Sequence, residues 1–138
     1  MPPLYKVRDK RAFLTAAFGQ LAGSAMVSFE GSLSGTGLLN MTGSSHDETK
    51  VLKRNTLWPK QDFIVLPLEP ETAASIMNAI GGTVPRGIIH IQVEKADRLQ
   101  LGLYDNFAPK AMLFGPALTP QILETFQNHG LISTWTEK

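Results

Sequence analysis

The sequence predicts a single α+β domain over residues 1–138, in which about three helices cover one face of a mostly antiparallel sheet. Two observations lead to this prediction. Apolar residues alternate with polar ones in two adjacent segments, 88–94 and 98–104, as in the strands of an antiparallel hairpin. Three other segments have apolar residues at helical spacing, and short strand candidates are scattered irregularly between them. Irregular succession of this kind is typical of α+β folds.

Length and composition agree with one ordinary domain. The chain has 138 residues, of which 43% are hydrophobic, and its net charge is +1. It contains no cysteine, which excludes disulfides and thiolate metal sites. The charged N-terminus does not resemble a signal peptide, and no apolar stretch approaches the length of a membrane span. We therefore expect a soluble, cytoplasmic protein with no membrane partner.

The first half of the chain predicts two strands around one helix. Residues 4–7 and 25–29 are the strand candidates, and Asp9 is placed to cap a helix that runs to about Leu21. Glycine, serine and threonine dominate the following stretch, residues 31–49. There we expect an irregular segment or weak strand at 38–41 and then a mobile loop at 42–49.

The middle of the chain predicts a strand and a second helix. Residues 63–66 form a continuous apolar run, as in a central strand, and Pro67 limits pairing at the end of that strand. Glu69-Pro70 opens the helix, because proline is tolerated in a first helical turn. Gly81-Gly82 closes it.

The alternation also predicts the register of the hairpin. A loop of Lys95-Ala96-Asp97 would set Glu94 opposite Arg98 and place six apolar side chains on one face. The apolar pairs would be Val93 with Leu99, Ile91 with Leu101 and Ile89 with Leu103. The opposite face would then be polar but nearly uncharged.

The last third predicts a strand at 111–114, a helix and a short final strand or packed tail at 131–135. Thr119-Pro120 is a favourable helix opening, since the hydroxyl caps the helix and proline fits its first position. Gly130 suits its end.

The sequence contains no motif that fixes a reaction. His46 lies beside Asp47 and Glu48, but this spacing matches no compact metal-binding motif. The nucleophile-elbow pattern Gly-x-Ser-x-Gly is absent. We expect no metal and no cofactor, and whether the chain is an enzyme stays open.

Candidate binding residues come from three places: the polar face of the hairpin, the end of its second strand, and the segment 50–60, which has four cations and no acid. They are His90, Gln92, Gln100, Tyr104, Asp105, Arg54 and Trp58. We expect the cations to be mostly solvated and Trp58 to pack inward, because it follows Leu57.

Two functions of different classes remain. The favoured one is a non-catalytic binding or protein-interaction module, whose polar sheet face binds a protein partner or a second copy in a homodimer. The alternative is a small enzyme or small-molecule-binding protein, with a site between the sheet and the 42–60 segment that uses His90, Asp105 or His46. Near-neutral net charge speaks against a nucleic-acid partner.

Overall fold

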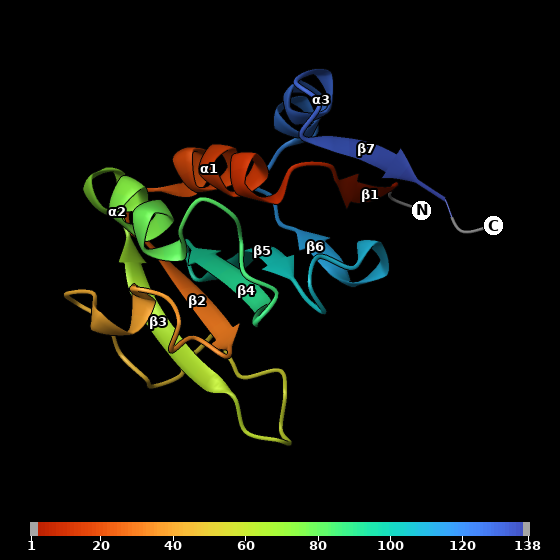
Figure 1. Cartoon of the computed structure of the whole chain (residues 1–138). Helices are drawn as coiled ribbons and strands as arrows, with labels where there is room; N and C mark the ends of the chain where they lie inside the picture. Colours follow the sequence, from red (N-terminus) through yellow and green to blue (C-terminus); the bar gives the residue numbers. More distant parts are fainter. Residues whose placement is uncertain (1–2, 137–138) are drawn as a thin grey trace.

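The computed structural model describes residues 3–136 and confirms the α+β class (Figure 1). Its elements are β1 (Leu4–Val7), α1 (Lys10–Leu21), β2 (Ala25–Gly31), the 3-10 helix η1 (Leu38–Asn40), β3 (Asp62–Leu68), α2 (Pro70–Ile80), β4 (Ile88–Lys95), β5 (Arg98–Leu103), the 3-10 helix η2 (Pro109–Ala111), β6 (Met112–Phe114), α3 (Pro120–Asn128) and β7 (Ile132–Trp135). An antiparallel sheet of five strands has the order β3-β2-β4-β5-β6. β1 and β7 form a separate antiparallel ribbon.

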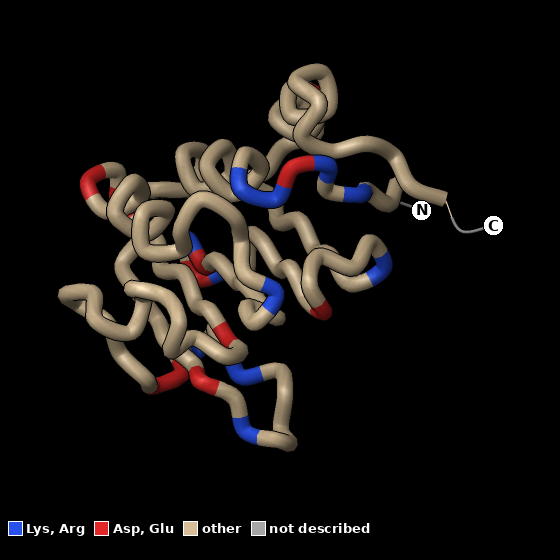
Figure 2. Tube along the Cα trace, in the orientation of Figure 1, with Lys and Arg blue, Asp and Glu red and all other residues tan. Residues whose placement is uncertain are grey.

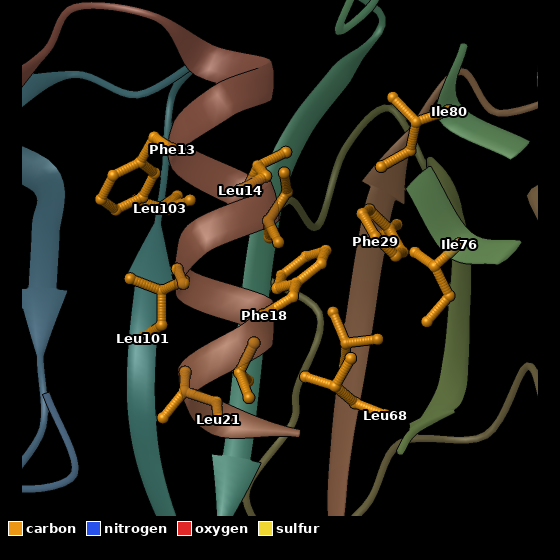
Figure 3. Close-up of a cluster of buried hydrophobic side chains, with 14 of the residues drawn as sticks. Phe13, Leu14, Phe18, Leu21, Phe29, Leu68, Ile76, Ile80, Leu101 and Leu103 are labelled. Atoms are coloured by element: carbon orange, nitrogen blue, oxygen red, sulfur yellow. The ribbon is translucent and has the colours of Figure 1, made fainter. Parts of the chain in front are cut away.

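The main core lies between the five-stranded sheet and the helices α1 and α2 (Figures 1 and 3). Phe18 of α1 meets Phe29 of β2 edge to face, with 6.3 Å between ring centroids. α3 lies against the β1–β7 ribbon, and its Phe126 packs on Phe13 of α1 at 5.9 Å. Aromatic pairs in this geometry contribute beyond their buried area, so these contacts fix how the helices sit.

The helix starts follow the predicted capping. The side chain of Asp9 accepts a hydrogen bond from the Ala12 amide, and that of Thr119 accepts one from the Ile122 amide. Each cap satisfies a backbone donor that has no partner inside the helix. Residues 38–41, predicted as an irregular segment or weak strand, contain the 3-10 helix η1, with Leu38 fully buried.

β3 is an edge strand, so its prediction as a central strand was wrong. It pairs with β2 along its whole length, and on its other side Ser45 makes an isolated bridge with Val65. Both of its faces are nevertheless buried. Ile64 and Leu66 face the main core, while Phe63 and Val65 join a second cluster on the other side of the sheet. Burial of both faces explains the continuous apolar run.

The hairpin forms, but its predicted register was wrong. The loop has two residues, Ala96 and Asp97, and Lys95 rather than Glu94 lies opposite Arg98. Both loop residues have positive φ, 56° and 61°, as a tight hairpin turn requires. A bulge between Val93 and Glu94 restores the match, so the observed apolar pairs are Val93 with Leu101 and Ile91 with Leu103. Leu99 therefore lies on the other face, in the second cluster.

The second face of the sheet is covered by residues 45–56, which we call the strap. Leu52 of the strap is fully buried against Phe63 and Val65. The Thr49 hydroxyl donates to Glu94 Oε1 at 2.6 Å. Together with the Ser45 bridge, this bond ties the segment that we predicted to be mobile to β3 and β4.

Candidate functional site

The polar face of the hairpin is occupied by the chain's own strap. The side-chain nitrogen of Gln92, Nε2, donates to the Lys53 backbone carbonyl at 2.8 Å and to the Ser28 hydroxyl at 3.1 Å. The Tyr104 hydroxyl donates to the amide oxygen of Gln92 at 3.0 Å. Burial of Tyr104 raises the pKa of its hydroxyl above the ordinary value of 10.0, because the phenolate would lose hydration. Gln92 is buried under the strap, so it is not accessible to a partner.

Both ring nitrogens of His90 have partners inside the fold. The Asp105 amide donates to Nδ1 at 3.2 Å, and Nε2 lies 2.8 Å from the Thr56 hydroxyl. Since Nδ1 must keep its lone pair for the Asp105 amide, the ring proton sits on Nε2 and points to Thr56. His90 is buried and lies 5.7 Å from the ring of Tyr104. In this arrangement its nitrogens hold the strap and the end of β5 in place.

Glu30 belongs to the same cluster, although the sequence did not indicate it as a site residue. Its carboxylate accepts the backbone amides of Asn55 at 2.8 Å and Thr56 at 3.1 Å, and the side chain is 1% exposed. Glu30 lies opposite His90 in the β2–β4 pairing. Its signal was an acid inside an otherwise apolar strand, but the pairing of β2 with β4 was needed to place it beside His90.

The structure brings His90, Gln92 and Tyr104 together with the backbone of Asp105, whose side chain is exposed. Gln100 is separate, because the bulge turns it toward the segment after β6. Its amide nitrogen donates to the Lys95 carbonyl, and its amide oxygen accepts from the Ala117 amide at 2.8 Å. Gln100 therefore secures that segment.

Trp58 does not pack inward, so that expectation was wrong. Leu57 is 88% exposed and Trp58 87% exposed, in a turn that follows the strap. We call residues 57–60 the tip. Lys50, Lys53 and Lys60 are exposed, as expected, but Arg54 is half-buried, so the expectation of a solvated side chain was wrong there.

The tip stands on a fixed base. On the side that enters the tip, the Glu30 carboxylate accepts hydrogen bonds from the backbone amides of Asn55 and Thr56. On the side that leaves the tip, the Gln61 carbonyl accepts a hydrogen bond from Arg54 Nη1 at 2.7 Å. The guanidinium of Arg54 also lies 5.1 Å from the centroid of the Phe63 ring. The polar cluster under the strap thus supports a projecting apolar turn.

A hollow of about 600 Å³ lies between β1, β6 and the start of α3; we call it the groove. Its lining comes from residues 3–5, 112–116, 118–120 and 123 and has no charged side chain. Leu4 is 38% exposed and Leu113 54% exposed at this site. Tyr5 and Phe114 form part of its wall, edge to face at 5.8 Å. The hydroxyl of Thr119 is used by its helix cap. The groove is therefore mainly an apolar surface.

Among residues 3–136, every large apolar side chain that is exposed lies at the tip or at the groove. Charges, in contrast, are interspersed over the molecule rather than gathered on one side (Figure 2). Exposed apolar side chains that gather at a few places on a surface are typical of interaction sites. The sequence signal for the groove was weak, because its strands are short and its lining joins three distant segments.

No family model, curated protein or solved structure matches the chain. The described residues contain no group of three or more histidine or acidic side chains that could hold a metal ion. His46 lies apart from the His90 cluster and hydrogen-bonds the Phe63 carbonyl through Nδ1 at 3.1 Å. No helix in the described part of the chain is both long and apolar enough to cross a bilayer.

Proposed function

We propose that the chain is a non-catalytic protein-interaction module that binds an apolar, aromatic-containing segment of a partner protein in the groove. The observation that carries this proposal is the groove itself, an uncharged hollow of about 600 Å³ bordered by the exposed side chains of Leu4 and Leu113. Pockets of this size and lining bury most of the surface of a small ligand or side-chain cluster. Aromatic and aliphatic anchors that fill such pockets supply most of the binding free energy at protein interfaces.

The state of the polar cluster favours a binding module over a small enzyme. A general base needs a nitrogen or oxygen that can reach a substrate proton. Both nitrogens of His90 are engaged with Thr56 and the Asp105 amide, and the Glu30 carboxylate is engaged with two strap amides. An enzyme that used these groups would first have to detach the strap from the sheet.

Peptide selection tests the proposal directly. A displayed peptide library is panned against the wild-type chain, and selected peptides are then titrated against Leu113→Glu and Ser75→Glu variants. Leu113 is exposed, so glutamate there places a charge in the groove while the fold remains. We expect selected peptides to share an aromatic or large aliphatic anchor, and to lose more than about tenfold in affinity for Leu113→Glu.

Ser75→Glu is the matched control, because it places the same charge at an exposed position of α2 that lies outside the groove. Peptide binding to this variant should match the wild-type value. Peptides that bind wild-type and Leu113→Glu equally, or a library that yields no binder, would refute the proposal.

A further inference from the structure

The tip and the groove are complementary features on one chain. The tip presents Leu57 and Trp58, both almost fully exposed, and the groove offers about 600 Å³ of uncharged space. An apolar cavity of about 150 Å³ holds one benzene molecule. The groove therefore has room for an indole ring together with a leucine side chain.

The two features are far apart in one molecule. The tip leads directly into β3, whereas β6 forms one wall of the groove, and β3 and β6 are the opposite edge strands of the sheet. The turn before β3 projects away from β1, β6 and α3 (Figure 1). None of the residues that line the groove belongs to the tip. A chain in this fold leaves both apolar surfaces exposed, so their burial requires a second molecule.

The tip has the properties of a preformed anchor. Glu30 and Arg54 hold the two sides of its base through backbone hydrogen bonds of 2.7–3.1 Å. A fixed base lowers the conformational entropy that is lost on binding. Tryptophan is also among the residues most enriched at the energetic centres of protein interfaces.

We propose that two copies of this chain dimerise by exchanging tips, so that Leu57 and Trp58 of each copy occupy the groove of the other. This inference rests on the proposed function and specifies the partner as a second copy. Buried aromatic residues remove about 150–250 Å² each from solvent. One seated tip buries two side chains and the groove that receives them, which is less than about 1,200 Å², the lower end of stable interfaces. Two reciprocal contacts double the buried area, which favours an exchange of tips over a single contact.

Sedimentation of wild-type, Trp58→Ser and Leu113→Glu chains, alone and mixed, tests this pairing. The wild-type chain should show a concentration-dependent dimer. Each variant alone should dimerise more than about tenfold more weakly, because both contacts are lost. An equimolar mixture of the two variants should form a heterodimer that is weaker than the wild-type dimer. In that pair one contact survives, between the intact tip of Leu113→Glu and the intact groove of Trp58→Ser. Lys53→Ser, which changes an exposed cation beside the tip, is the control and should dimerise like wild type.

Fluorescence follows the same contact without relying on mass. The chain has two tryptophans, so a Trp135→Phe/Leu113→Glu chain carries Trp58 as its single tryptophan. Titration with a tryptophan-free Trp58→Ser/Trp135→Phe chain should shift the emission of Trp58 to the blue as the ring leaves water. A titrant that also carries Leu113→Glu should produce no shift.

A wild-type chain that stays monomeric up to millimolar concentration would overturn the tip exchange. So would a dimer that persists in both single variants, or a mixture of the two variants that associates no more strongly than either variant alone. The two proposals can fail independently. If selected peptides bind the groove of a chain that stays monomeric, the groove is an interaction site for another protein, and only the exchange of tips is wrong.

Discussion

The imidazole of His90 and the hydroxyl of Thr56 lie 2.8 Å apart, which joins the middle of β4 to the last residue of the strap. On its other side the same ring accepts the Asp105 amide. One side chain therefore connects three segments that are distant in sequence. The alternation of β4 alone predicts a small cost for replacing His90, because the residue faces away from the main core. The structure changes that expectation.

His90→Ala should lower the free energy of unfolding by about 1–3 kcal/mol, since it leaves the Asp105 amide and the Thr56 hydroxyl without partners. Ile91→Ala, in the main core, should cost about 2–5 kcal/mol. Urea denaturation measures both. Arg98→Ala, at an exposed position of β5, is the control and should change little. A His90→Ala loss as small as that of the control would contradict a role for the ring in holding the strap.

Glu30→Gln should loosen the base of the tip. The glutamine side chain has one oxygen acceptor, whereas both carboxylate oxygens of Glu30 accept strap amides. We expect a loss of about 1.5–3 kcal/mol for a hydrogen bond to a charged group. Hydrogen exchange should accelerate at the amides of Asn55 and Thr56 more than in β4. Glu124→Gln, at an exposed position of α3 beyond its first turn, should leave both measurements unchanged. Unaltered exchange at Asn55 and Thr56 would be evidence against this anchoring.

The turn of the hairpin can be improved. Ala96 and Asp97 both have positive φ, a conformation that costs most L-residues about 1–2 kcal/mol. Asparagine followed by glycine is the preferred pair for such a turn. Ala96→Asn/Asp97→Gly should therefore raise stability by about 1 kcal/mol and raise the melting temperature. Ala96→Val should lower the melting temperature, because a β-branched residue disfavours positive φ. The reverse order of melting temperatures would show that these residues do not adopt this turn.

Tyr104 should ionise above pH 10. The chain has two tyrosines, so in a Tyr5→Phe chain the phenolate absorbance reports Tyr104 directly. Burial raises the folded-state pKa above the ordinary value of 10.0, so the folded protein holds this proton more tightly than the unfolded chain. The associated stability is present below pH 10 and is lost as the pH rises through the raised pKa. A titration midpoint at or below 10.0 would mean that the Tyr104 hydroxyl is hydrated.

Binding to nucleic acid should be weak and should vanish at physiological salt. The exposed Trp58 could stack on a base, a contact worth about 1–3 kcal/mol, and Lys53 and Lys60 lie beside it. However, charges of both signs are interspersed over the molecule (Figure 2), and a few phosphate contacts lose affinity steeply as salt is added. A salt titration with single- and double-stranded oligonucleotides measures this. Submicromolar affinity that persists at physiological salt, and that Lys53→Ala/Arg54→Ala abolishes, would make nucleic acid the leading partner.

The sequence predicted the parts of the fold that depend on short-range pattern. Ile91 and Leu103 lie in the core because period-two alternation fixes the face of a strand residue. Asp9 and Thr119 cap their helices because the side-chain preference there is local. The register of the hairpin failed, since the alternation alone does not reveal the bulge beside Val93.

The candidate site was less predictable because it depends on long-range contacts. Leu52 docks on Phe63 and Val65, and this contact brings the strap over the polar face. Nothing near Leu52 in sequence indicates that it is fully buried. Trp58 follows the strap in a turn and is 87% exposed. The sequence therefore indicated neither the buried position of Leu52 nor the exposure of Trp58.

Ser45 makes two backbone hydrogen bonds with Val65, of 2.7 and 2.9 Å, on the outer edge of β3. That edge belongs to an apolar, strongly β-forming run, residues 63–66, of the kind that recruits strands from other molecules when it is bare. By pairing with Val65, Ser45 of the strap covers part of an edge that could otherwise recruit strands from other molecules. A mutation that frees the strap, even one that leaves the main core intact, would show itself first as precipitation of a chain whose secondary structure is still native.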